Sequence, residues 1–157
     1  MKKLIVIGLL FYACSAQAQE RMNNVPQKPH AIYGNVGFLL GPNISINYEQ
    51  ILRPFKRNEN NLLYYRGGIG YMTQYFGEYV YLAAQLGMIT AAHKNHHFDL
   101  AGGIFLNQSI DDRFLENTLI PITITVAYRY QWPDSNGYFK IGGGLLEGFQ
   151  ISGGVRF

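Results

Sequence analysis

The feature of this sequence that most restricts its fold is a series of segments, each roughly ten residues long, in which apolar and polar side chains alternate. Successive side chains of a β-strand point to opposite faces, so this alternation predicts strands with one apolar face. Glycine, proline and asparagine, which favour turns, lie between the segments. The eight predicted strands are Ala31–Leu40, Asn43–Leu52, Leu62–Thr73, Tyr79–Thr90, His96–Leu106, Leu119–Tyr130, Tyr138–Leu145 and Phe149–Phe157.

Alternation alone is compatible with two arrangements. In a soluble barrel the apolar face points inward, whereas in a membrane barrel it points outward, toward lipid. Three features favour the membrane arrangement: aromatic residues near strand ends, few charged residues on the strands, and a final residue, Phe157, that is aromatic and lies on the apolar face. We therefore predict an all-β, eight-stranded antiparallel up-and-down transmembrane barrel.

The N-terminus has the pattern of a secretory signal peptide. Lys2 and Lys3 precede an apolar run from residue 4 to 13, and Ala16-Gln17-Ala18 has the small-x-small form of a cleavage site. We predict a cleaved signal at residues 1–18, a flexible lead-in at 19–30 and the barrel at 31–157. An uncleaved N-terminal anchor, or lipid attachment at Cys14 in place of its removal, are the alternatives.

Charge and cysteine content exclude two classes of protein. The formal net charge of +3 includes Lys2 and Lys3, which leave with the signal, and no basic run indicates a nucleic-acid partner. Cys14 is the only cysteine and also lies in the signal. Packing, lipid or partners must therefore stabilise the mature chain without a disulfide.

Six ionisable residues lie on the polar faces of the predicted strands, and with both termini in the periplasm they all fall in the periplasmic half of the lumen: Glu49, Arg66, Asp99, Arg129, Lys140 and Arg156. The hairpins set Glu49 about opposite Arg66. They also bring Asp99 near Arg129, with Lys140 facing Arg129. Buried charges must be paired, so we predict a structural network that fixes strand register. A proton or ion path through these charges is the alternative.

An eight-stranded barrel is narrow enough for side chains to fill its interior. We therefore expect the charged network to plug the lumen and prevent appreciable conduction. The aromatic residues predicted to complete this plug are Tyr33, Tyr64, Tyr79, Tyr81 and Phe105.

Candidate reactive residues do not form a known motif. The histidines at 93, 96 and 97 lie beside a turn, but their spacing matches no standard metal-ligand pattern, so we expect a solvated turn. The serines at 45, 109 and 152 fall on other strands or loops, without the histidine that would activate them. The charged loop containing Asp111, Asp112, Arg113 and Glu116 is expected to be solvated. We predict neither catalysis nor a cofactor.

Several short motifs carry a family resemblance, and together they cover nearly all of the mature chain. These are Asn47-Tyr48-Glu49 after a Gly-Pro turn, Arg66-Gly67-Gly68-Ile69-Gly70-Tyr71, His96-His97-Phe98-Asp99-Leu100, Tyr128-Arg129-Tyr130-Gln131 and the glycine-rich ending. The chain resembles small eight-stranded outer-membrane barrels of the OmpA membrane-domain and OmpX type, and most closely uncharacterised short barrels of Bacteroidota. The ending Val155-Arg156-Phe157 resembles their C-terminal strand signal.

The resemblance implies a location in the bacterial outer membrane, with outer-membrane lipid and the barrel-assembly machinery as partners. It brings no established activity and indicates no protein partner. The predicted function is that of a plugged outer-membrane barrel with a structural or interaction role. One alternative is a secreted soluble β-barrel that binds a small apolar ligand. A second is a lipid-modifying outer-membrane enzyme.

Overall fold

The computed structural model describes residues 28–39, 41–55, 58–74, 77–90, 95–110, 122–132 and 135–157. The predicted signal peptide, most of the predicted lead-in, and the loop with Asp111, Asp112, Arg113 and Glu116 lie outside these ranges. Within them no helix is long and apolar enough to cross a membrane.

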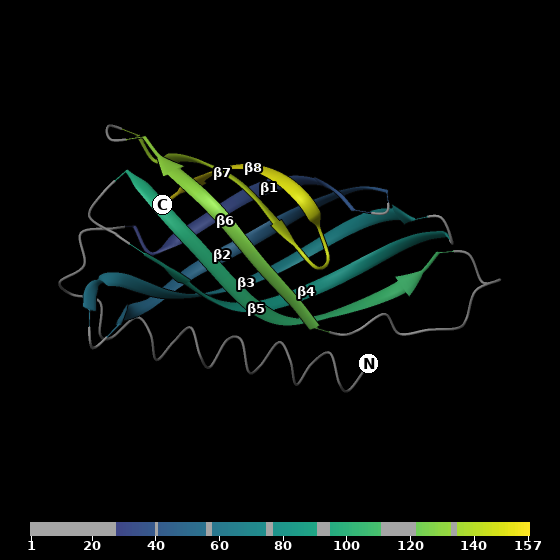
Figure 1. Cartoon of the computed structure of the whole chain (residues 1–157), viewed down its shortest axis with the longest axis horizontal. Helices are drawn as coiled ribbons and strands as arrows, with labels where there is room; N and C mark the ends of the chain where they lie inside the picture. The colour runs from purple at the N-terminus through teal and green to yellow at the C-terminus, as the bar shows by residue number, and fades with distance from the viewer. Residues whose placement is uncertain are drawn as a thin grey trace.

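Eight antiparallel strands form a closed barrel in which each strand pairs with its neighbours in the sequence and β1 pairs with β8 (Figure 1). The predicted all-β, eight-stranded antiparallel barrel is therefore confirmed. The strands are β1 His30–Phe38, β2 Pro42–Phe55, β3 Asn58–Gln74, β4 Gly77–Ile89, β5 His96–Ser109, β6 Ile122–Gln131, β7 Gly137–Gly144 and β8 Gly148–Arg156.

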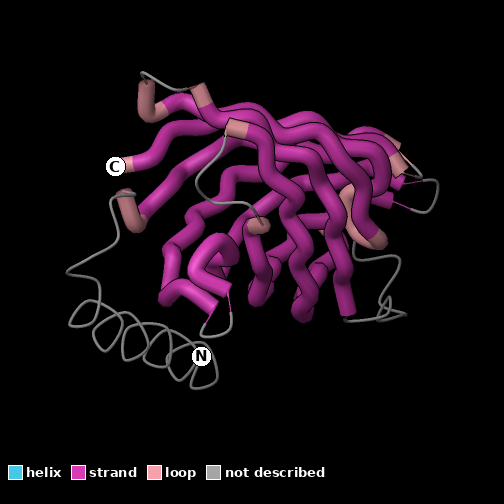
Figure 2. The backbone as a smooth tube through the Cα atoms, turned by 60° about the vertical axis from the view of Figure 1, so that its left-hand side comes forward, coloured by secondary structure: helices cyan, strands magenta, loops and turns pink. Residues whose placement is uncertain are grey.

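The first and last strands close the barrel at one end through their backbones. His30 N donates to Phe157 O at 3.2 Å, and Phe157 N donates to His30 O at 2.9 Å. We call this end of the barrel the closure end. The C-terminus lies there, beside the start of β1 (Figure 2).

The β2–β3 hairpin extends beyond its predicted limits. The predicted strands end at Leu52 and begin again at Leu62, which leaves residues 53–61 as a connection, but β2 continues to Phe55 and β3 begins at Asn58. That prediction is wrong, because backbone pairing continues through residues whose side chains do not alternate. The pairing shifts register on both sides of Pro54, between Ile51 and Arg53 and between Pro54 and Phe55. Proline has no amide hydrogen to donate to a ladder, so it belongs at such irregularities.

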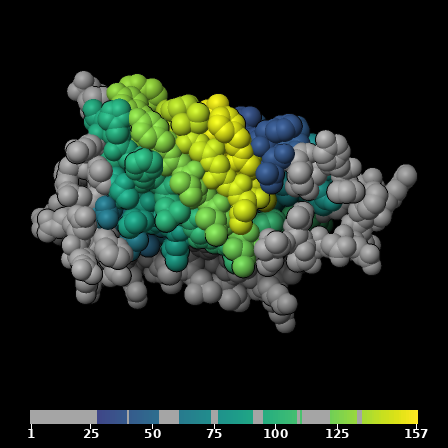
Figure 3. All heavy atoms as spheres, viewed as in Figure 1, coloured from purple at the N-terminus to yellow at the C-terminus, as the bar shows by residue number. Residues whose placement is uncertain are grey.

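Side chains alternate between a polar interior and an apolar exterior. On β1 and β6 every second side chain is buried, and the intervening ones are exposed. The buried set includes Asn35, Glu49, Gln85, Asp99, Thr125, Arg129 and Ser152. The exposed set includes Ile46, Leu86, Phe98, Ile104, Ile124 and Val155. Figure 3 shows one side of this outer wall, where β8 lies beside β1. The barrel is thus apolar outside, and its interior holds the polar and charged side chains together with apolar clusters.

Candidate functional site

An ion network lies inside the lumen, in the half nearer the closure end, and Arg129 of β6 is its central residue. Its guanidinium binds Glu49 of β2 with two hydrogen bonds, of 2.8 Å from Nη1 and 2.6 Å from Nη2. Nη2 also lies 2.9 Å from Oδ2 of Asp99 on β5. Lys140 of β7 places Nζ 3.3 Å from Glu49 Oε2 and 3.2 Å from Asp99 Oδ2. Two carboxylates therefore lie between two cations and join four strands.

The two remaining predicted charges lie at the margin of this network. Arg156 of β8 reaches Glu49 Oε1 only at 3.9 Å. Arg66 is opposite Glu49 in the β2–β3 register, as predicted. Its guanidinium instead donates to the hydroxyl oxygen of Tyr33 at 2.8 Å and to the side-chain oxygen of Gln85. Gln85 is the residue opposite Arg66 across β3 and β4, so the Arg66 side chain bonds this register partner and not Glu49.

On β5, the residue opposite Arg129 along the backbone is not the residue that the Arg129 side chain contacts. The backbone partner of Arg129 on β5 is His97, whereas Asp99 is opposite Ala127. The Arg129 side chain is long enough to bridge this offset and reach the Asp99 carboxylate. Across the next interface, Arg129 is directly opposite Lys140, as predicted. The carboxylates of Glu49 and Asp99 compensate for these adjacent like charges, which would otherwise repel.

Tyrosine rings surround the charged groups. Tyr64 donates a hydrogen bond to the Asp99 carboxylate. The Lys140 ammonium lies 3.9 Å from the centre of the Tyr33 ring, and the Arg129 guanidinium carbon lies 4.8 Å from the centre of the Tyr138 ring. Cations over ring faces at these distances are attracted by the ring quadrupole. The aromatic residues therefore stabilise the positive charges as well as fill space.

Two glycines on neighbouring strands make room for lumen tyrosines. On β3 and β4, Tyr64 is opposite Gly87 and Gly70 is opposite Tyr81. A β-carbon at Gly87 would overlap the Tyr64 ring, and one at Gly70 would overlap the Tyr81 ring. Each tyrosine thus crosses into the lumen over a glycine. This packing explains why glycine stands at positions 70 and 87.

The other part of the lumen is filled by an apolar cluster. Met72, Tyr81, Phe105 and Leu146 are buried together, with Tyr79 partly buried against them. Leu146 belongs to the tight turn between β7 and β8, where Gly148 adopts a positive φ of 62° that suits glycine. That turn is anchored by Asn43, whose Nδ2 donates to the Glu147 backbone oxygen at 2.9 Å.

All six predicted charged residues are buried, with at most 5 % of any of them exposed: Glu49, Arg66, Asp99, Arg129, Lys140 and Arg156. Direct ion pairs connect all of them except Arg66. The sequence reasoning missed Tyr138 and Gln85. Tyr138 precedes Lys140 by two residues and so shares its face, which is the signal that could have identified it. Gln85 lies on the same face as Tyr79 and Tyr81, but it is uncharged and so falls outside a search for ionisable residues.

The residues of the predicted C-terminal strand signal lie on the outer wall. Val155 is 49 % exposed and Phe157 is 55 % exposed. The Phe157 ring stacks on His30 with ring centres 5.9 Å apart. Both side chains are therefore accessible from outside the barrel.

The histidines do not converge on one site. His96 is exposed and hydrogen-bonds Tyr128, whereas His97 is buried and its Nδ1 lies 3.1 Å from the Thr90 backbone oxygen. Adjacent strand residues point to opposite faces, which separates these two rings. His93 lies outside the described residues. Among the described residues no group of three or more histidine, cysteine, aspartate or glutamate side chains is placed to hold a metal ion.

Two of the three candidate serines have described side chains, and both point into the lumen. Ser45 accepts a hydrogen bond from Asn47 at 2.9 Å, and Ser152 donates to Asn35 at 2.9 Å. The geometry places amide groups, rather than an imidazole, beside these hydroxyls. The arrangement of the lumen as a whole is therefore one that ties strands together through buried ion pairs and hydrogen bonds.

Comparison with protein-family models, with curated proteins and with solved structures finds no match to this chain, so the site stands on its own geometry.

Proposed function

We propose that this protein is a small β-barrel of a bacterial outer membrane, exported by its N-terminal signal, with a lumen plugged by its own side chains. Its role is structural or an interaction within the membrane, without catalysis. The observation that carries the proposal is the polarity of the barrel, which has ion pairs inside and aliphatic side chains outside. Membrane barrels have this polarity because lipid is the solvent for their outer face.

Water is a poor solvent for such an exterior. Soluble monomers rarely expose a continuous apolar patch of more than a few hundred Å². Here exposed aliphatic or aromatic side chains occur on the outward face of every strand except β7, whose outward side chains are only partly exposed. Lipid would cover this wall without any partner protein. The resemblance to OmpA-type barrels supports the same location, and the exposed Val155 and Phe157 are accessible to an assembly machinery that recognises the last strand.

The polar lumen also favours this proposal over the two alternatives. A soluble barrel that binds an apolar ligand needs an apolar interior, but the centre of this lumen holds Glu49, Asp99 and Arg129. A lipid-modifying enzyme needs a nucleophile and an activating base within hydrogen-bond reach. The serine hydroxyls at 45 and 152 instead bond to asparagine side chains.

Cell fractionation with a gel of heated and unheated samples tests the proposal. The protein should sediment with outer membranes and migrate differently before and after boiling, because a folded barrel resists the detergent until it is heated. A protein recovered in the soluble periplasmic fraction would overturn the proposal.

Conductance in planar bilayers tests the plugged lumen separately. The buried ion network and the apolar cluster of Met72, Tyr81, Phe105 and Leu146 fill the lumen. A membrane that contains the barrel should therefore show no more than its background conductance. Steady, large open channels from the purified protein would show that the lumen is not plugged.

A further inference from the structure

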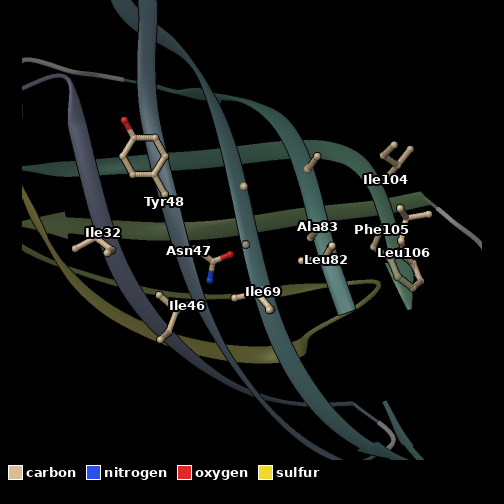
Figure 4. Close-up of a pocket in the computed structure, with 13 residues that line it drawn as sticks. Ile32, Ile46, Asn47, Tyr48, Ile69, Leu82, Ala83, Ile104, Phe105 and Leu106 are labelled. Carbon is tan, nitrogen blue, oxygen red and sulfur yellow. The ribbon is translucent and has the colours of Figure 1, made fainter. Parts of the chain in front are cut away.

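The outer wall of the barrel has an apolar hollow of about 490 Å³ that crosses β1 to β5. Its outward-facing walls are Ile32, Ile46, Ile69, Leu82, Ile104 and Leu106. Figure 4 shows Ile32 and Tyr48 at one side of this hollow and Ile104 and Leu106 at the other. The volume lies within the range of roughly 300–1,000 Å³ that is usual for small-molecule sites.

Small residues on the outer face of the wall create this hollow. On the outer face Gly67 of β3 is directly opposite Ala84 of β4, between taller aliphatic neighbours. On the inner face Gly68 and Ala83 are opposite each other. With so little side chain on the outer face, the floor of the hollow is formed close to the backbone. A β-carbon added at Gly67 would meet no atom within 4 Å, so the space above it is open.

The chemistry of the hollow matches a lipid. The strands are paired on both sides in a closed barrel, so the wall has no free strand edge for a protein segment to extend. The outward-facing lining is aliphatic except for Tyr48, whose hydroxyl is 2.6 Å from Nδ1 of His30. His30 also stacks on Phe157 at the closure end. The hollow therefore has an apolar lining, with the hydrogen-bonded pair of His30 and Tyr48 on the side nearer the closure end.

We propose that this hollow is a binding site for one acyl chain of a membrane phospholipid, with the His30–Tyr48 pair near its headgroup region. This proposal rests on the proposed location of the barrel in a membrane. Lipid surrounds such a barrel, and the hollow is continuous with the apolar wall that lipid covers. A chain in the hollow exchanges more slowly than its neighbours, because it contacts protein on several sides.

Native mass spectrometry of the barrel tests the proposal. The full chain is reconstituted in vesicles of phosphatidylethanolamine and phosphatidylglycerol and then released in mild detergent. The wild-type barrel should retain one phospholipid. Gly67→Leu fills the hollow from β3 and should lose that phospholipid. Gly153→Leu is the matched control, because Gly153 is also outward-facing with no atom near an added β-carbon but lies on β8, away from the hollow.

The gel mobility of unheated samples shows whether each variant has folded, and Ala84→Leu replaces Gly67→Leu if the latter does not fold. Equal lipid retention in the wild type and a folded hollow-filling variant would overturn the proposal, as would the absence of retained lipid in the wild type. If the wild type is a dimer and Gly67→Leu dissociates it, the hollow is occupied by a second copy of this chain. That result would overturn the proposal. A soluble protein would instead overturn the proposed function, so the two failures are distinguishable.

Discussion

Arg129 makes the two shortest ion pairs of the lumen network described above. From β6 it reaches Glu49 on β2 and Asp99 on β5, and its guanidinium lies over the Tyr138 ring of β7. It is fully buried. A buried charge is stabilised only by its partners, so their removal costs more than the ion pair itself contributes.

Arg129→Met should lower the free energy of unfolding by about 3–5 kcal/mol, because it leaves two buried carboxylates with Lys140 as their main cation. The measurement is urea unfolding of the refolded barrel in detergent. Arg156→Met is the control, with a smaller expected loss because the ion pair of Arg156 with Glu49, at 3.9 Å, is longer than the 2.6 Å pair of Arg129. Equal losses in the two variants would contradict the central place given to Arg129.

Alanine substitutions at two adjacent glycines of β8 should have different effects on stability. A β-carbon at Gly154 would meet the Tyr33 β-carbon and the Ile32 backbone oxygen at 2.3–2.4 Å, whereas one at Gly153 would meet no atom within 4 Å. Gly154→Ala should therefore destabilise the barrel by about 1–3 kcal/mol through overpacking. Gly153→Ala should change its stability by no more than about 0.5 kcal/mol. The same unfolding experiment measures both, and similar values for the two variants would refute the close approach at Gly154.

Sequence alternation predicts which residues face the lumen, because the two-residue period of a strand is rigid. It does not predict which long side chains meet. Arg66 is opposite Glu49 on one neighbouring strand and opposite Gln85 on the other, and its side chain bonds Gln85. The contacts of Tyr138 likewise depend on how β6, β7 and β8 are staggered, which no single strand encodes.

At the scale of elements, β6 has the clearest division between faces. Its side chains at Ile122, Ile124 and Val126 are exposed, while those at Thr123 and Thr125 are fully buried. The sequence predicts both faces of this strand. Strand ends are less predictable, as the extended β2–β3 hairpin shows, because backbone pairing does not need alternating side chains.

Ile124→Arg separates the two possible surroundings of β6. In a membrane, an outward arginine costs about 2–4 kcal/mol at the bilayer midplane. We therefore expect reduced insertion, measured as the fraction of protein that shows the mobility of the folded form in an unheated gel. In water, the same exposed substitution would be nearly neutral. Ile124→Leu, which keeps the position apolar, should insert like the wild type, and equal insertion of both variants would argue against a lipid-facing β6.

At the scale of the whole molecule, closure and polarity are separate properties. Closure follows from eight strands that pair in sequence order, with β1 and β8 joined through His30 and Phe157, and the strand count was predictable from the turn residues. The polarity of the outer face determines whether the barrel is suited to water or to lipid. Alternation defines two faces but not which one points inward, and burial of the charged face resolves that ambiguity.

The most direct test of the central claim is a single-cysteine scan along β6, from Ile122 to Tyr130, in a chain whose native Cys14 is replaced by serine. Each cysteine carries a nitroxide label in the reconstituted protein, and its collisions with oxygen, which dissolves in lipid, and with a water-soluble nickel complex are measured. If the apolar face of β6 meets lipid, the even-numbered positions should contact oxygen and show little contact with nickel. Nickel contact at the even-numbered positions, or no alternation along the strand, would contradict a barrel whose apolar face meets lipid.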